Sequence, residues 1–113
     1  MNTVTIVSEA DIDLSGIERA LAGHLNCHRG AGGQLVVEES NSRVYIYHPP
    51  GGSGELTMNE LYLDYSWVDL VKNVVERIAD NPLWTVENDF GTTLPGDKFV
   101  ARLKDDPNWD WRV

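Results

Sequence analysis

Three residues that could bind a metal ion or supply a nucleophile and a base lie close together: His24, Cys27 and His28. Apolar residues at helical spacing predict a helix over residues 16–27, and histidines four apart on such a helix share a face. With a thiolate they could ligate zinc or copper, but zinc uses three or four protein ligands and no further Cys or His tract completes the set. Histidines near a helix C-terminus are also favoured by its dipole. We therefore expect an ordinary helix end, with no metal and no other cofactor.

A nucleophilic active site needs a nucleophile, a base and an orienting group that converge in space. Cys27 and His28 are sequence neighbours, so their side chains diverge, and no motif surrounds His48 at the end of its strand. Carboxylate pairs such as Asp64 and Asp69 could act in acid–base catalysis, but acids are so frequent here that such pairs arise by chance. The sequence predicts that the protein is not an enzyme.

A pocket between the sheet and the helices, lined by Tyr45, Tyr47 and His48, would support an alternative function. The two glycine-rich segments, 30–33 and 51–54, lack the features of a phosphate-binding loop, so nucleotide binding is not expected. The alternative is a small enzyme or ligand-binding domain.

The distribution of acidic residues is the strongest functional signal. The formal net charge is −9, and −6 of it falls between residues 54 and 89, where eight acids are accompanied only by Lys72 and Arg77. Such a surface repels nucleic acid and attracts a basic protein. The sequence therefore predicts a protein partner and no nucleic acid.

The second predicted helix carries part of this acid on one exposed stripe, at Asp69, Asn73, Glu76 and Asp80. Glu76 and Asp80 are like charges four residues apart, and Asp80 lies where an acid opposes the helix dipole. Residues that break local rules without compensation often serve a function. The alternative is that the acid only keeps a small protein soluble.

Outward positions on the strand before this helix extend the stripe with Glu60, Tyr62 and Asp64, since the connection at Ser66 is short. In the polar C-terminal tail, two tryptophans either fold back into the core or serve as exposed anchors, a role in which tryptophan is enriched. The predicted partner-binding residues are Glu60, Tyr62, Asp64, Asp69, Glu76, Asp80, Trp109 and Trp111.

These features favour a small acidic binding protein that inhibits or neutralises a basic partner, such as a toxin or a nuclease. In general character it is similar to bacterial toxin-immunity proteins. That similarity implies that surface acids would stand in for phosphates if the partner is a nuclease. A weaker third hypothesis is an accessory domain of a larger assembly.

The elements that must position these residues follow from hydrophobic periodicity and turn signals. Ser66 is expected to cap the second helix, whose buried face would contain Trp67, Val71, Val74, Val75 and Ile78. Strands are predicted at 3–7, 34–39, 43–48, 56–65 and 83–87, and helices at 16–27, 67–80 and 98–104. The order β-α-β-β-β-α-β-α predicts an α+β fold: a single domain over residues 1–113, with a mostly antiparallel four- to five-stranded sheet and about three helices.

Length and composition are consistent with one folded domain. A chain of 113 residues that is 42% hydrophobic can form a real core without disulfides, and Cys27 is its single cysteine. The N-terminus lacks the basic region of a signal peptide, and no apolar run approaches the roughly 20 residues of a membrane span. We expect a soluble, cytoplasmic protein that does not bind a membrane.

Overall fold

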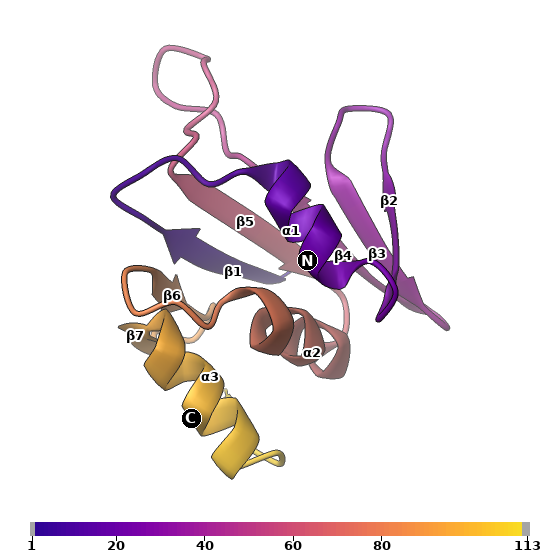
Figure 1. The fold of residues 1–113 in the computed structure, drawn as a ribbon, viewed down its shortest axis with the longest axis vertical. Helices are drawn as coiled ribbons and strands as arrows, with labels where there is room; N and C mark the ends of the chain where they lie inside the picture. Colours follow the sequence, from indigo (N-terminus) through magenta and orange to yellow (C-terminus); the bar gives the residue numbers. More distant parts are fainter. Residues whose placement is uncertain (1, 112–113) are drawn as a thin grey trace.

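The computed structural model describes residues 2–111, which fold into one α+β domain with seven strands and three helices (Figure 1). The strands form a single sheet in the order β2-β3-β4-β5-β1-β6-β7, and every neighbouring pair is antiparallel. In chain order the elements are β1 (Asn2–Val7), α1 (Leu14–Leu21), β2 (Asn26–Arg29), β3 (Leu35–Glu39), β4 (Ser42–Tyr47), β5 (Glu60–Tyr65), α2 (Val68–Ile78), β6 (Thr85–Glu87), β7 (Thr93–Pro95) and α3 (Gly96–Asp105).

The α+β class and the antiparallel sheet are confirmed, but the sheet has seven strands instead of four to five. The predicted first helix is too long, because α1 ends at Leu21 and Gly23 adopts a left-handed φ of 82°. The residues after it form β2, which pairs with β3. The second added strand, β7, has only three residues and pairs with β6. The predicted strand over 56–65 shortens to β5, because residues 49–58 form a projecting connection instead.

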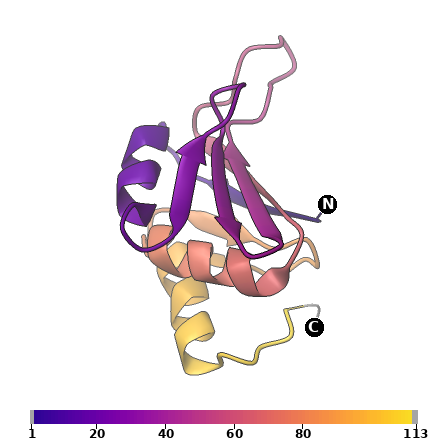
Figure 2. The same ribbon diagram turned by 90° about the vertical axis from the view of Figure 1, so that its right-hand side faces the viewer.

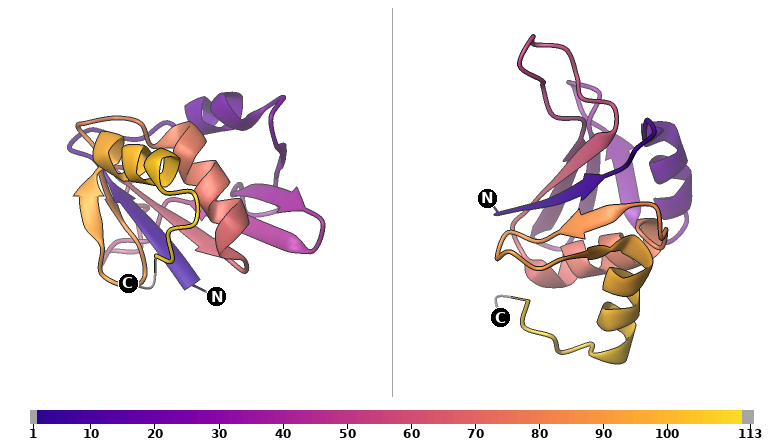
Figure 3. Two further views of the ribbon diagram at one scale, coloured as in Figure 1. Left: turned by 90° about the horizontal axis from the view of Figure 1, so that it is seen from below. Right: turned by 90° about the vertical axis from the view of Figure 1, so that its left-hand side faces the viewer.

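One face of the sheet is buried under the helices. Alternate residues on the central strands, such as Val4, Ile6, Leu61 and Leu63, are fully buried and form the core with the apolar faces of α1, α2 and α3. Figures 2 and 3 show the three helices together on one side of the sheet. No described helix covers the opposite face, which we call the open face.

The second helix confirms most of its predicted buried face and corrects its start. Val71, Val74, Val75 and Ile78 are buried, whereas Trp67 is 62% exposed at the N-cap position. Ser66 does not cap α2, because its Oγ accepts a hydrogen bond from the backbone N–H of Arg43 (3.2 Å) and so ties the helix entrance to β4. No described helix is long and apolar enough to cross a membrane.

The C-terminal tail folds back onto the core, which decides between its two predicted roles. Trp109 and Trp111 are 3% and 1% exposed and pack against Phe99. The Trp111 indole N–H donates to the hydroxyl of Tyr65 (3.2 Å), and the Asn88 side-chain amide donates to the Trp111 carbonyl (2.9 Å). Both tryptophans are therefore core residues and not exposed anchors. Burial of their large indole rings removes more apolar surface from water than an exposed tail would.

Candidate functional site

Acidic residues are divided unevenly between the helices and the rest of the molecule. The three helices contain five acids and six bases, a net charge of +1. The strands, connections and chain ends contain the other thirteen acids and only three bases, a net charge of −10. The acidic character therefore belongs to the sheet and its connections, and the helical layer is close to neutral.

The residues predicted to form one acidic binding surface lie on two different sides of the molecule. Glu60, Tyr62 and Asp64 alternate with buried residues of β5, so they lie on the open face. Helix α2 packs against the other face of the sheet, and it carries Asp69 and Glu76, with Asp80 just beyond its end. The short connection at residues 66–67 leads the chain from one layer to the other instead of placing them side by side.

The stripe on α2 is also not an acidic patch. Glu76 shares a shallow surface depression with Arg77, Lys104 and His24. The Arg77 guanidinium donates from Nε to the Asn73 side-chain oxygen (3.0 Å) along the same helix. Basic groups from α2 and α3 therefore offset the acids that sequence periodicity placed together.

An edge that contains acids and no Lys or Arg forms instead where two connections meet. The backbone N–H of Ser8 donates to the Asn59 carbonyl (2.9 Å), and the N–H of Ile12 donates to the Met58 carbonyl (2.8 Å). These hydrogen bonds hold the β1–α1 connection, residues 8–13, against the β4–β5 connection, residues 48–59. The two segments and the first residue of β5 contain no Lys or Arg, and we define the acidic rim by their five acids, Glu9, Asp11, Asp13, Glu55 and Glu60.

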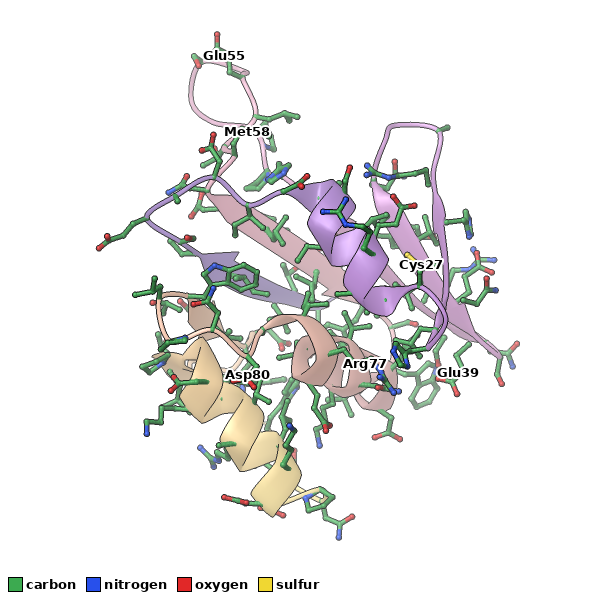
Figure 4. The ribbon with its side chains drawn as sticks, viewed as in Figure 1. Cys27, Glu39, Glu55, Met58, Arg77 and Asp80 are labelled. Carbon is green, nitrogen blue, oxygen red and sulfur yellow. The ribbon has the colours of Figure 1, made fainter. Side chains whose placement is uncertain are left out.

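The rim also exposes apolar side chains. Leu56 is 59% exposed and Met58 is 42% exposed. Figure 4 shows Glu55 at the tip of the projecting β4–β5 connection and Met58 at its base, well separated from Asp80 beside the helices. The charge of one rim acid, Asp13, is partly offset by the Arg19 guanidinium, which lies 3.7 Å away. Asp13 also caps α1, because its side chain accepts a hydrogen bond from the Ser15 N–H (3.0 Å).

A cavity of about 520 Å³, which we call the edge cavity, opens beside the rim. Its walls come from four places: the β2–β3 turn, the start of α1, the segment that runs from β4 into the projecting connection, and β5. Residues Leu14, Gly32, Gly33, Gln34, Tyr45, Tyr47, His48, Pro50, Leu56 and Asp64 line it. Tyr45, Tyr47 and His48, which were predicted to line one pocket, do line one cavity, although it lies at the end of β4 beside the β2–β3 turn and not beneath the helices.

Asp64 is the one acid in the wall of the edge cavity. Its two oxygens accept hydrogen bonds from the Thr3 hydroxyl (2.7 Å) and the Tyr47 hydroxyl (2.8 Å). Desolvation raises the pKa of Tyr47 to about 12, with further contributions from the hydrogen bond to Asp64 and from its charge. The Tyr47 ring meets the Tyr62 ring edge to face, at a centroid distance of 5.9 Å. These contacts fix the positions of the carboxylate and both rings before anything binds.

His48 also lines the edge cavity, and one of its ring nitrogens has no hydrogen-bond partner. It is 8% exposed, and its Nδ1 lies 2.9 Å from the carbonyl oxygen of Glu60. Because a carbonyl can only accept, Nδ1 carries the proton in this arrangement, which leaves Nε2 of a neutral ring as an acceptor. In the part of the chain that the structure describes, this Nε2 is the single buried side-chain nitrogen or oxygen with no hydrogen-bond partner.

The β2–β3 turn forms the opposite wall and is held by its own hydrogen bonds. The Gln34 side-chain oxygen accepts from the Gly32 N–H (3.0 Å), and the Gly30 N–H donates to the Gln34 carbonyl (2.7 Å). Gly33 adopts a φ of 84°, which favours glycine, and its carbonyl accepts from the Arg29 guanidinium (2.9 Å). A Cβ at Gly30 would lie 2.8 Å from the Gln34 side chain, so this glycine permits the close approach.

The residues considered as metal ligands are separated by the end of α1. His24 is exposed in the turn after the helix, whereas Cys27 and His28 are consecutive residues of β2 and point to opposite faces. His28 lies 3.8 Å from Glu38, and burial together with the charge of Glu18 raises the pKa of Cys27. Within residues 2–111, no three His, Cys, Asp or Glu side chains gather as a metal site.

Comparison with protein-family models, with curated proteins and with solved structures finds no match for this chain. The site is therefore interpreted from its own residues. Gln34, Leu56 and the rim acids before α1 are not among the residues predicted from the sequence. A signal for the rim was present, because segments 8–13 and 48–60 together hold five acids and no Lys or Arg.

Proposed function

We propose that this protein binds and inhibits a basic protein partner, in the manner of a toxin-immunity protein, and that it acts in the cytoplasm without a cofactor and without catalysing a reaction. The observation that carries the proposal is the separation of charge: a net −10 outside the helices and +1 on them. If the acidic residues served only solubility, they would be distributed over every exposed element. That would include the helices, which offer many exposed positions.

The acidic rim is the part of the surface best suited to attract a basic partner. Four of its acids, Glu9, Asp11, Asp13 and Glu55, are exposed, and Glu60 is half-buried. Charges of one sign steer association over distances near the Debye length, about 8 Å at physiological salt. Exposed Leu56 and Met58 supply apolar contact area within the same edge, and methionine is enriched in interfaces.

The open face next to the rim offers a flat area with rigid aromatic side chains. Tyr45, Tyr47 and Tyr62 are half-buried there, and Tyr47 is held by Asp64. Tyrosine loses little conformational entropy on binding and presents both apolar and polar surface. The rim would therefore set the rate of association, while the tyrosines would set the lifetime of the complex.

The edge cavity favours a second candidate function, a small ligand-binding domain. Its volume of about 520 Å³ lies within the range of small-molecule sites. In this case a free ligand, and not a protein, would occupy the cavity beside Tyr45, Tyr47 and His48.

Two matched double variants test the first function. Asp11→Lys with Glu55→Lys reverses two rim charges, and Asp69→Lys with Glu76→Lys reverses two charges on α2, so both raise the net charge by four. Immobilised wild-type protein is used to capture a stoichiometric partner from its native cell extract. We expect a basic protein that the α2 variant retains and the rim variant loses.

The purified partner then allows a kinetic measurement. For the rim variant we expect association at least about tenfold slower at low salt, with a weaker dependence of its rate on ionic strength. The proposal fails if wild-type protein captures no basic partner at physiological salt, or if both double variants weaken binding equally.

A further inference from the structure

The connection between β4 and β5 is longer than the sheet requires. Tyr47 and Tyr62 pair directly in these neighbouring antiparallel strands, so a turn of about two to five residues would be enough to join them. The chain instead uses residues 48–59 for the connection. Connections of this length are uncommon in compact domains and usually serve a function. The need to join the two strands therefore does not explain the length of this segment.

Residues 49–57 form a small hairpin within this connection, which we call the hairpin arm. Pro50 pairs with Leu56 in an isolated β-bridge, and the Thr57 N–H donates to the Pro49 carbonyl (2.7 Å). The arm extends beyond the end of the sheet in every view (Figures 1, 2 and 3). The arm is therefore held in shape by pairing between its own two strands.

The base of the arm is fixed to the rest of the protein. Besides the backbone hydrogen bonds that Met58 and Asn59 accept from Ile12 and Ser8, the Asn59 side-chain amide donates to the Ser8 carbonyl (2.9 Å). The arm therefore projects in a defined direction. A segment that is ordered in this way before binding loses less conformational entropy when a partner encloses it.

The tip of the arm is narrow. The Gly51 N–H donates to the Glu55 carbonyl (2.6 Å), and the Gly54 N–H donates to the Gly51 carbonyl (3.0 Å). Gly54 has a φ of 84°, so the tip is the three-residue hairpin loop in which a turn is followed by a left-handed residue. Three of the four residues 51–54 are glycine, which leaves little side-chain volume around the backbone. Such a tip fits a cleft that is too narrow for a loop with large side chains.

The arm adds exposed surface to the protein and little to its core. Residues 52–56 are all exposed, and apolar Leu56 is 59% exposed. None of residues 50–57 belongs to the hydrophobic core. Ordering a glycine-rich loop costs conformational entropy, and the arm buries little apolar surface that would offset this cost. Folding stability alone therefore does not explain the arm.

We infer that the hairpin arm inserts into a narrow basic cleft of the partner and blocks it. This inference rests on the proposed function and gives inhibition a physical basis, because an occupied cleft cannot admit a substrate. Segment 48–59 contains one acid, Glu55, and no Lys or Arg, so its charge suits a basic cleft. Glu55 lies at the tip, where its carboxylate faces basic groups in the cleft, and Leu56 faces the apolar part of the wall.

Hydrogen exchange tests whether the tip is enclosed in the complex. Isotope-labelled wild-type protein is mixed with the partner that immobilised wild-type protein captures, and amide exchange is measured by NMR in the free and bound states. Gly52 and Ser53 are exposed, so their amides should exchange rapidly in the free protein and at least about tenfold more slowly in the complex. Protection confined to residues 8–13 and 58–60 would show that the partner docks beside the arm, and would overturn the inference.

Gly52→Trp tests the cleft by shape alone. Gly52 does not have a positive φ, and a Cβ there would meet no heavy atom of another part of the chain within 4 Å, so the free protein has room for a large side chain. A tryptophan at the tip does not fit a cleft shaped for glycine, and the dissociation constant should rise by about tenfold or more.

Ala101→Trp is the matched control, because Ala101 is exposed on α3 and lies outside the arm. It should leave the dissociation constant unchanged. Wild-type affinity in Gly52→Trp, or an equal loss of affinity in Ala101→Trp, would show that the arm does not enter a narrow cleft.

A shortened arm separates the shape of the arm from its charge. Replacing residues 50–56 with an Asn-Gly turn leaves the hydrogen-bonded pair Pro49 and Thr57 to close a two-residue hairpin loop. This variant should keep the wild-type urea denaturation midpoint and bind at least about tenfold more weakly than Glu55→Gln, which removes the same charge at full length. Equal affinity of the two variants would mean that the arm contributes only charge. If the shortened variant does not fold, Gly52→Trp and hydrogen exchange still test the inference.

The same partner separates this inference from the proposed function. If the rim variant loses the partner while Gly52→Trp and the shortened arm bind it as tightly as wild type, the arm inference fails and the proposed function stands. If wild-type protein captures no basic partner, the proposed function fails and the arm inference fails with it.

Discussion

The helical layer and the open face use similar residues for different purposes. On the helix-covered face, the hydroxyl of Tyr65 donates to exposed Asp89 (2.5 Å) and also accepts from the Trp111 indole, so Tyr65 links this acid to the buried C-terminal tail. On the open face, the hydroxyl of Tyr47 donates to Asp64 (2.8 Å), and this carboxylate remains in the wall of a cavity. A Tyr–Asp pair therefore contacts the C-terminal tail on one side of the sheet and lines a cavity on the other.

The charges of the two regions differ in the same way. The helices balance five acids with six bases, whereas the strands, connections and chain ends hold thirteen acids and three bases. Balanced charge suits a layer whose task is packing, and excess charge suits a surface that attracts a partner. Substitutions in the two regions should accordingly affect different measurements.

The largest expected effect is in the core under α2. Val75 is fully buried there, so Val75→Asp forces an unpaired carboxylate into an apolar site. We expect a loss of more than about 4 kcal/mol in the free energy of unfolding, enough to prevent folding of a typical small domain. Circular dichroism and urea denaturation measure this. A variant with the wild-type denaturation midpoint would show that the face of α2 is wrongly assigned.

The next largest effect compares an aromatic residue from each region. Trp111→Ala removes a side chain packed against Phe99 and Tyr65, and should lower the free energy of unfolding by about 3–5 kcal/mol. Tyr62→Ala removes a half-buried ring from the open face, and should cost about 1 kcal/mol or less. Urea denaturation of both variants measures the difference. Equal losses would mean that the tail is no more part of the core than the open face is.

A strand or helix could be predicted from the sequence only where contacts between residues close in the chain determine it. The periodicity of β5 and α2 correctly predicts their buried faces, since each pattern spans at least three repeats. The first helix was overextended because residues up to 25 continue its apolar spacing, and only the left-handed backbone at Gly23 shows where it ends. β7 is too short for any periodic signal.

The candidate site was predictable only where its residues are neighbours in the chain. Tyr45, Tyr47 and His48 come from one segment, so they could be grouped from the sequence. Gln34 and Leu56 reach the same cavity from other segments, through pairing that no local pattern specifies. One base beside Glu76 could not be predicted for the same reason: Lys104 comes from α3, which is distant in sequence.

A smaller effect is expected in the ionisation of the two Tyr–Asp pairs. The pKa of Tyr47 is raised to about 12, and that of Tyr65 is raised further by burial and by Asp89. The unfolded chain loses these protons near pH 10, so their contribution to stability is complete below pH 10 and is lost as the pH rises toward 12 and beyond. Stability should therefore fall with pH above about 10.

The variant Asp64→Asn distinguishes the two pairs. It should lower the pKa of Tyr47 while leaving it above its usual value near 10, because desolvation is the largest cause of the shift and remains. The pKa of Tyr65 should not change. Ultraviolet titration of the phenolate, with residue-specific NMR to separate the tyrosines, measures both. An unchanged pKa of Tyr47 would mean that its hydrogen bond to Asp64 contributes nothing to the shift.

The smallest effect is the change in folding stability caused by the two charge-reversal variants. Asp69→Lys removes an acid from the first turn of α2, where it suits the helix dipole, and should cost about 0.3–1 kcal/mol. Glu76→Lys replaces a like-charge pair with Asp80 by an attractive one and offsets part of that loss. Reversal of Asp11 and Glu55 relieves repulsion within the rim, so this variant should be at least as stable as wild type.

Urea denaturation should thus place both double variants within about 0.5–1 kcal/mol of the wild-type free energy of unfolding, with the rim variant the more stable of the two. The order of the two stabilities decides how a loss of binding in the rim variant is interpreted. If the rim variant binds its partner poorly while folding at least as well as the α2 variant, lost stability cannot account for lost binding. A rim variant that unfolds more easily than the α2 variant would show that the rim acids hold the two connections together, and would assign them to the fold instead of to recognition.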